Sequence, residues 1–189
     1  FASAVQPLPE LLAAATGSGA LTFMPDGDGV VRRVPMALAL AGAPVPSLSA
    51  ELLRVAQGVD NHILRTAEGP APALAQVRIG QTTVPTNAQG EMWLHYTTEQ
   101  PARYVPAWRV LAGEADPALL EGHIVLVGSS AQGLMDLRFN SLGRVMPGVE
   151  AHAQALEQVL SGYYLNRPNW AVSAELIAVV LGCVAMVWI

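Results

Sequence analysis

Hydrophobic and polar positions follow a helical period in some segments and a strand-like pattern in others, which predicts a mixed α/β fold. Residues 47–58 read as an amphipathic helix that ends at a glycine. Residues 147–161 read as a second amphipathic helix, opened by Pro147. A short helix is predicted over residues 7–19, and two helical pieces over residues 104–122. The predicted apolar stripes are Leu48, Leu52 and Val55 in the first amphipathic helix and Val149, Ala153, Leu156 and Leu160 in the second.

Strand-like segments lie between these helices. Residues 20–24 and 30–34 are β-prone, and the turn sequence Pro-Asp-Gly-Asp-Gly between them predicts a hairpin. Residues 77–96 predict two or three short strands, whereas residues 59–75 lack periodicity and are expected to form a loop. The continuous apolar run at residues 123–128 is typical of a central strand covered on both faces. We therefore expect a mixed sheet with flanking helices and peripheral hairpins.

The C-terminal segment is the most apolar part of the chain. Residues 170–189 include one charged side chain, Glu175, in twenty positions. A helix of this length spans about 30 Å, the thickness of the hydrocarbon core of a bilayer. A buried core helix is the alternative, but apolar residues on nearly all faces favour a membrane span. We therefore predict a domain over residues 1–167 and a first transmembrane helix over residues 168–189.

Charge and cysteine content argue against a nucleic-acid partner and against an internal disulfide. The net charge is −5, and all ten basic residues are arginines. Because no basic patch or arginine run occurs, a nucleic-acid partner is not expected. The single cysteine, Cys183, excludes an internal disulfide.

A loop of small residues follows the predicted strand at 123–128. Residues 128–133 read Gly-Ser-Ser-Ala-Gln-Gly, one residue too long for the Gly-x-Ser-x-Gly elbow of hydrolases. The loop also lacks the second glycine of a dinucleotide fingerprint and the lysine of a phosphate-binding loop. Three interpretations stay open. The loop is a tight turn that ends the strand, or it contacts a ligand, since ligands in open α/β sheets favour the carboxyl ends of strands. The least favoured interpretation is a catalytic serine.

Asp136 and Arg138 lie in the same long loop, where both side chains can point into one cleft. The planar guanidinium of an arginine binds a carboxylate or phosphate through two parallel hydrogen bonds. An internal Asp–Arg pair that holds the loop is the equal alternative. The candidate ligand-binding residues are Ser129, Ser130, Asp136, Arg138 and His152.

Catalytic and metal-binding patterns are not complete. Glu150 and His152 do not have the four-residue histidine spacing of a zinc-binding helix. The Asp-Gly-Asp-Gly sequence at 26–29 lacks the later ligands of a calcium loop. Neither an activated nucleophile nor a matched acid/base pair is evident. We therefore predict no catalytic residues, no metal and no cofactor in this segment.

Several motifs occur together in the order typical of one family. They are PDGDGVVRRVPM, TNAQGEMWLHY and a block at 122–170 that contains GLMDLR, MPGVEAHA, LSG and RPNW. With the apolar segment that follows, they resemble the second class of CHASE domain, the cyclase/histidine-kinase-associated sensory extracellular domain, over nearly the whole chain. Residues 139–141 depart from the Thr-Pro-like turn expected there. The family domain is longer at its N-terminus, so the N-terminal part of the domain is expected to be missing.

The resemblance implies the sensory part of a bacterial receptor, with residues 1–167 on the periplasmic or extracellular side of the inner (cell) membrane. It implies a cytoplasmic output module, foremost an adenylate or guanylate cyclase, with a histidine or serine/threonine kinase as the alternative. The implied partners are the lipid bilayer, a second copy in a homodimer, and a small-molecule or protein stimulus. Two other classes stay open: a membrane-anchored extracytoplasmic serine hydrolase using Ser129 or Ser130, and a scaffold of the cell envelope.

Overall fold

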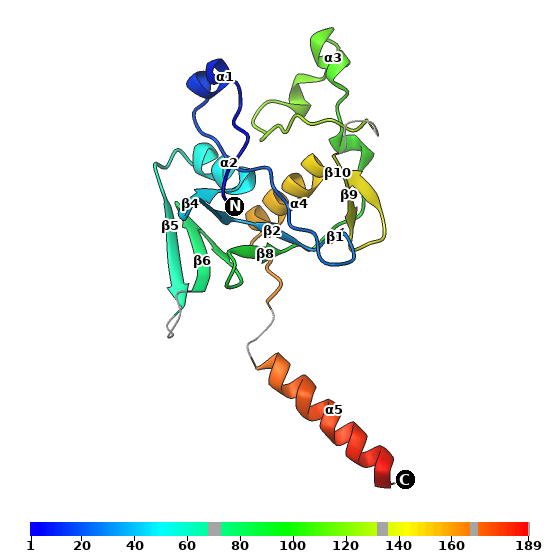
Figure 1. Cartoon of the computed structure of the whole chain (residues 1–189). Helices are drawn as coiled ribbons and strands as arrows, with labels where there is room; N and C mark the ends of the chain where they lie inside the picture. The colour runs from blue at the N-terminus through cyan, green and yellow to red at the C-terminus, as the bar shows by residue number, and fades with distance from the viewer. Residues whose placement is uncertain (68–72, 132–135, 167–169, 189) are drawn as a thin grey trace.

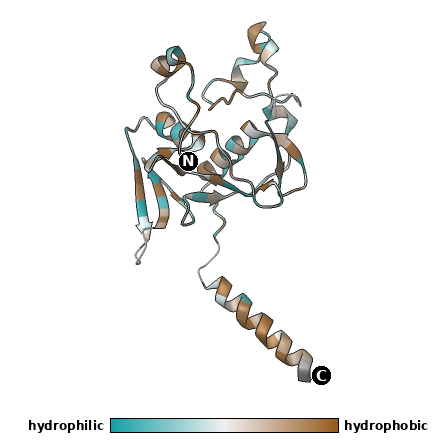
Figure 2. Cartoon of the chain, in the orientation of Figure 1, coloured by the Kyte–Doolittle hydropathy of each residue, from teal (hydrophilic) through white to brown (hydrophobic). Residues whose placement is uncertain are grey.

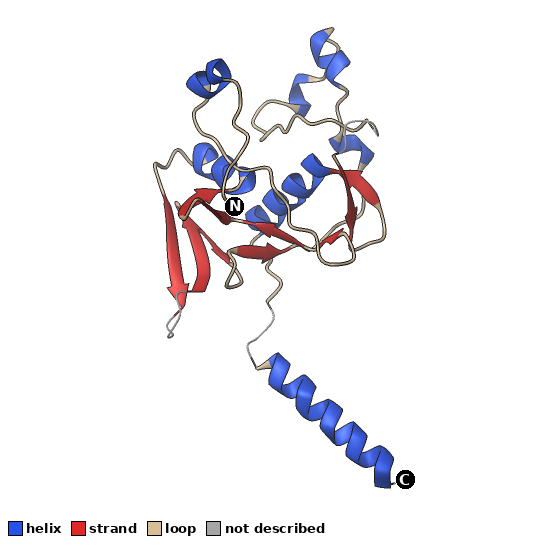
Figure 3. Ribbon diagram, in the orientation of Figure 1, coloured by secondary structure: helices blue, strands red, loops and turns tan. Residues whose placement is uncertain are grey.

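The computed structural model describes residues 1–67, 73–131, 136–166 and 170–188. Two helices, α2 (Leu48–Ala56) and α4 (Gly148–Ser161), lie together beside a group of short strands (Figure 1). Runs of consecutive strands are separated by helices along the chain (Figure 3), and α5 (Ala171–Trp188) stands apart from the rest. The predicted mixed α/β class is confirmed.

The shorter helical elements lie where the sequence predicts them. α1 (Pro9–Ala14) has its proline at the first helical position and Glu10 in its first turn, as expected for a helix start. α3 (Ala107–Leu111) and a 3₁₀ turn at Pro117–Leu119 are the two helical pieces predicted over residues 104–122. A further 3₁₀ turn is formed by Pro101–Arg103.

The strands form four small sheets within the described residues. The first sheet has the order β1–β9–β10, in which β1 is parallel to β9; the paired strands β2–β8 and β3–β4 and the sheet β5–β6–β7 are antiparallel. The strand bounds are β1 (Val30–Val31), β2 (Arg33–Pro35), β3 (Ala37–Leu40), β4 (Ala43–Pro46), β5 (His62–Ala67), β6 (Ala73–Ile79), β7 (Thr82–Pro85), β8 (Glu91–Trp93), β9 (Leu137–Asn140) and β10 (Val145–Pro147). The two or three strands predicted over residues 77–96 are therefore confirmed.

One hydrophobic core connects these sheets with α2 and α4. Methionines from three separate segments, Met36, Met92 and Met146, are almost completely buried in it. Burial of one such side chain stabilises the fold by about 1.5–3 kcal/mol. Since the individual strands are short, this shared core is the main connection between the sheets.

The ends of α2 follow directly from its sequence. Ser47 is the N-cap, and its hydroxyl accepts a hydrogen bond from the amide of Ala50 at 3.3 Å. Glu51 in the first turn and Arg54 in the last turn complement the helix dipole. Gly58 has φ +62°, a left-handed conformation that glycine adopts without strain just beyond a helix end. The predicted helix over residues 47–58 is confirmed.

The buried faces of both amphipathic helices differ from the predicted stripes. α2 buries Ser49, Ala50 and Leu53, whereas Val55 is exposed. α4 buries Leu156 as predicted, but it also buries small and polar side chains in place of the exposed Leu160. The reason is that α4 contacts α2, β2 and β10, so its covered surface is much wider than one stripe.

The hairpin predicted between residues 20–24 and 30–34 is wrong. Its turn exists, because the amide of Gly29 donates to the carbonyl of Asp26 at 2.8 Å. The residues after the turn, however, pair with distant strands: β1 with β9, and β2 with β8. β-Propensity identifies these residues as strand formers but does not specify the partner strand.

The loop predicted over residues 59–75 is also wrong in part. β5 and the beginning of β6 lie in this segment, and residues 68–72 lie outside the described part of the chain. The two strands are paired from His62 opposite Ile79 to Ala67 opposite Ala73. Tertiary pairing therefore orders a segment that has little periodicity of its own.

The central strand predicted at residues 123–128 is not formed. Val125 and Val127 are 51% and 89% exposed, although Leu126 packs against the core. Within the described residues, no strand is hydrogen-bonded to this segment, so its apolar run has no ladder to join. A continuous apolar run indicates that a segment is suited to a buried strand. It does not show that a second strand is available to pair with it.

The C-terminal segment forms the helix α5, which is coloured mostly as hydrophobic in Figure 2. Its 18 residues correspond to about 27 Å, slightly less than the hydrocarbon thickness of about 30 Å, and include Glu175. Across the residues that the structure describes, no helix reaches the combined length and hydropathy of a membrane span. The prediction of a transmembrane helix over residues 168–189 is therefore corrected. The helix is present as α5, but it does not reach the length and hydropathy of a membrane span.

Candidate functional site

Asp136 and Arg138 lie at the N-terminal end of α4. The carbonyl of Asp136 accepts a hydrogen bond from the amide of Gly148 at 2.7 Å. The Oδ1 atom of Asp136 is 3.4 Å from Nη2 of Arg138, and Nη1 of Arg138 donates to the carbonyl of Leu137 at 3.0 Å. The internal ion pair expected as one alternative is present. Both side chains are partly exposed, at 40% and 32%.

The serines of the predicted ligand loop lie just before this region. Ser129 is half-buried and Ser130 is exposed. Gly128 brings the loop against the first turn of α4, since a Cβ atom at this glycine would be 2.6 Å from Cβ of Val149. Residues 132–135 of the loop lie outside the described residues. Ligand binding stays a prediction for the five candidate residues, Ser129, Ser130, Asp136, Arg138 and His152.

Replacing Gly128 with Ala should lower the free energy of unfolding by about 1 kcal/mol, because the added methyl group would overlap Val149. The loss is expected at the lower end of the overpacking range because the neighbouring segment is largely exposed and can shift. Urea denaturation of the wild type and the variant measures it. Gly27→Ala is the matched control, because no atom lies within 4 Å of a Cβ at that position. Equal losses in the two variants would contradict the close approach.

His152 lies in a different environment from the other candidate residues. Its side chain is buried, with the residue 1% exposed, and its Nδ1 atom is 2.8 Å from the hydroxyl oxygen of Ser49. The centres of the His152 and Phe23 rings are 4.4 Å apart. Burial lowers the pKa of His152 to about 4, although the backbone of Leu21 and the carboxylate of Asp136 act in the opposite direction. His152 is therefore a neutral link between α2 and α4 at pH 7.

Sequence reasoning missed Ser49, the partner of His152. Ser49 is completely buried and lies on the same face of α2 as Leu53. Its signal in the sequence is weak, because a serine near a helix N-terminus is usually a capping residue. The nearby Ser47 fills the capping role, which leaves Ser49 available to α4.

α4 is also joined to the extended segment that follows β8. The side-chain oxygen of Gln158 accepts a hydrogen bond from the amide of His95 at 2.9 Å, and its nitrogen donates to the carbonyl of Trp93 at 2.9 Å. The side-chain oxygen of Gln154 accepts from the amide of Thr97 at 3.2 Å. Both glutamines are at least nine-tenths buried. Buried polar bonds thus attach α4 to α2 on one side and to the β8 segment on another.

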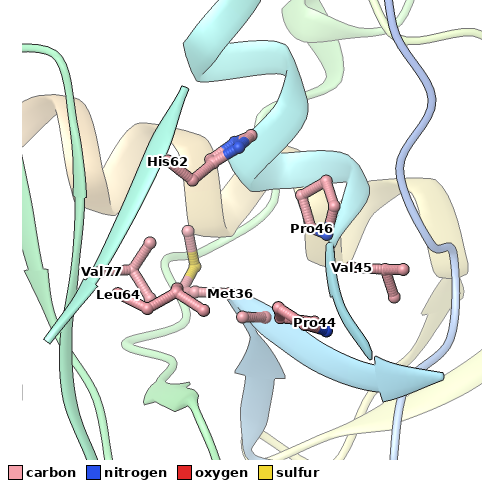
Figure 4. Close-up of a pocket in the computed structure, with 8 residues that line it drawn as sticks. Met36, Pro44, Val45, Pro46, His62, Leu64 and Val77 are labelled. Atoms are coloured by element: carbon pink, nitrogen blue, oxygen red, sulfur yellow. The ribbon is translucent and has the colours of Figure 1, made fainter. Parts of the chain in front are cut away.

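A small cavity lies between the β3–β4 hairpin and β5 (Figure 4). Its volume is about 180 Å³. Pro46 directly precedes the N-cap of α2, and the His62 ring lies against the same helix: its Nε2 atom is 3.3 Å from the carbonyl oxygen of Ala50. The cavity therefore touches both a rigid hairpin and a residue held by α2. It is lined by Met36, Ala37, Pro44, Val45, Pro46, His62, Leu64 and Val77.

A wider pocket of about 330 Å³ lies beside the C-terminal half of α4. Several of its polar groups already form the hydrogen bonds between α4 and the β8 segment. Its lining residues are His95, Thr97, Gln154, Glu157, Gln158, Ser161 and Tyr163. In the described part of the chain, no group of three His, Cys, Asp or Glu side chains is arranged to hold a metal ion. One cavity thus lies against the start of α2 and the other lies beside α4.

Comparison with known proteins identifies the family of the chain. The family model of the CHASE2 domain matches residues 1–189, the whole chain. No curated protein and no solved structure was found to match. CHASE2 domains are extracellular sensory domains of receptors with cyclase or kinase output. A match over the full length shows that the chain belongs to the CHASE2 domain family.

Proposed function

We propose that the chain is the extracytoplasmic sensory domain of a bacterial membrane receptor, with an adenylate or guanylate cyclase as the output module. A histidine or serine/threonine kinase is the alternative output. The observation that carries the proposal is the position of α4. This helix is attached to α2 through His152 and to the β8 segment through Gln154 and Gln158, and the chain continues from it toward α5.

The proposed mechanism is a shift between two positions of α4. A ligand changes the population of the two positions only if it binds one of them more tightly than the other. The cavity at β3–β4 is bounded by residues next to α2, and α2 contacts α4. α4 ends at Gly162, whose φ of +69° stops the helix. Residues 163–170, the connector, follow it and lead to α5. A change at α2 would therefore reach the connector through α4.

A homodimer is part of the proposal, because cyclase and histidine-kinase output modules generally work as dimers. The stimulus would be a small molecule or a protein on the outer side of the membrane. The lipid bilayer would lie beyond α4, on the side of the connector. These features rest on the family resemblance and on the direction in which the chain leaves α4.

Inserting Gly-Ser-Gly-Ser after Tyr164 should change the basal output of the full-length receptor at least threefold, because the insertion uncouples α4 from the segment that follows it. Cyclic AMP and cyclic GMP production by membranes from expressing cells is the measurement. The same insertion after the exposed Gly113, in the loop that follows α3, is the control and should have no effect. Equal output from all three proteins would rule out coupling through the connector.

The identity of the output is tested with the same membranes. Production of a cyclic nucleotide supports the cyclase assignment. If neither cyclic nucleotide is formed and the receptor instead becomes phosphorylated from ATP, the kinase alternative replaces it.

A further inference from the structure

We propose that the cavity between the β3–β4 hairpin and β5 binds a small, uncharged, apolar molecule about the size of one or two fused rings. The binding itself follows from the geometry of the cavity. Its role as a stimulus rests on the proposed sensory function. The residues that carry the inference come from β4, β5 and β6, together with the segment around Met36.

The chemistry of the lining selects an apolar ligand. Met36 and Val77 are completely buried and form the inner part of the cavity, and Leu64 and Pro46 border it on opposite sides (Figure 4). His62 is the one polar side chain among the eight lining residues. Burying a charged group against such a surface without a partner is strongly unfavourable. An uncharged ligand avoids this cost.

The size of the cavity limits the ligand further. A dry protein cavity of about 150 Å³ binds benzene, and this cavity has about 180 Å³. A helix with its side chains is about 10 Å wide and does not fit. The ligand is therefore a compact molecule, such as a single aromatic ring, a fused bicyclic ring or a short branched chain.

The hairpin disfavours an extended peptide as the occupant. β3 and β4 pair from Leu40 opposite Ala43 to Ala37 opposite Pro46, around a two-residue turn. In this register the nitrogens of Pro44 and Pro46 face away from β3. Prolines carry no amide proton, so the outer edge of β4 lacks the donors that an added strand needs. The two proline rings also form a stiff wall, which keeps the entropy cost of ligand binding low.

The cavity is connected to α2 through His62. The Nε2 atom of this histidine is 3.6 Å from the Glu51 carboxylate, which in turn binds Arg54. A molecule that fills the cavity contacts the His62 ring and the residue that precedes the N-cap of α2. A ligand bound in the cavity would therefore affect the position of both the N-terminal end and the first turn of α2.

Titration of the full 189-residue chain with indole and with benzene tests the inference. Saturable 1:1 binding of at least one probe is expected, with a rise in the thermal unfolding midpoint that grows with probe concentration. Leu64→Trp fills the cavity and should weaken binding at least tenfold. Ile63→Trp is the matched control, because Ile63 is the neighbouring residue of β5 and is 44% exposed, outside the lining. It should bind like the wild type.

Leu64→Phe is the second filling variant, a smaller change to be used if circular dichroism shows that Leu64→Trp does not fold. The inference is overturned if neither probe binds the wild type saturably, or if a folded filling variant binds as well as the wild type. Such a failure leaves the sensory function untouched, since the connector insertion tests that function without any ligand. Binding without any change in output would overturn only the role of this cavity in sensing.

Discussion

Replacing Arg33 with Met is expected to lower the free energy of unfolding by about 3 kcal/mol, because it leaves a buried carboxylate without its cationic partner. Nη1 of Arg33 is 3.0 Å from Oε2 of Glu91, a residue that is 3% exposed. The same guanidinium also pairs with Asp26. Without it, Glu91 keeps a hydrogen bond from the side-chain amide of Asn87 at 2.8 Å, which does not neutralise its charge.

The neighbouring Arg32 is the control for this prediction. It pairs with Asp26 and Asp28 at the turn, and its side chain is 36% exposed, so Arg32→Met should cost much less than Arg33→Met. Urea denaturation at pH 7 compares the variants. Adding Glu91→Gln to Arg33→Met should recover part of the loss, because it removes the unpaired charge. Similar losses for Arg32→Met and Arg33→Met would show that burial of Glu91 does not decide the effect.

Lowering the pH from 7 to 4.5 should remove about 2 kcal/mol of stability through His152 alone. The folded-state pKa of about 4 lies below the ordinary value of 6.5, so the unfolded chain binds this proton more readily. The stabilisation is therefore complete above pH 6.5 and is lost as the pH falls toward 4. Protonation in place would leave a charged imidazole in the core between α2 and α4.

His152→Gln separates this effect from the titration of carboxylates. Hydrogen bonds from arginines lower the pKa values of Glu51 and Asp26, so both carboxylates also contribute less stability in acid. Their contribution is the same in the wild type and in His152→Gln. Chemical denaturation of both proteins between pH 4.5 and 7.5 should show a steeper decline in the wild type. Parallel curves would mean that His152 does not titrate on unfolding.

Local signals in the sequence predict the helix ends well. Ser47 and Gly58 mark the limits of α2, and Pro147 and Gly162 mark those of α4. These residues act on the backbone within a few positions, so their effect does not depend on the rest of the fold. The order of motifs along the whole chain also identifies the family correctly.

Features that depend on distant neighbours could not be predicted in the same way. Val30 and Val31 are β-prone, but their partners are Phe139 and Asn140, more than a hundred residues later. The run at 123–128 has the composition of a buried strand and no neighbouring strand among the described residues. The partner of a strand is decided in the folded chain, so the sequence of one segment does not reveal it.

In the candidate site, too, local features could be predicted from the sequence, whereas features that depend on the folded chain could not. Polar residues near a predicted strand end led to Asp136 and Arg138, which do lie together. The cavity escaped notice because its lining is mostly apolar and comes from segments that only the folded hairpins bring together. His152 is buried against Ser49, and its contact with a ligand stays a prediction.

The glutamines of α4 have a consequence for observing movement in this domain. The amide protons of His95 and Thr97 are held by the side chains of Gln158 and Gln154 rather than by a neighbouring strand. Their exchange with deuterated solvent therefore requires α4 to withdraw from the β8 segment, or the segment itself to open. The rate of deuterium uptake at these two amides therefore measures how often that contact opens, in the resting domain and after a stimulus.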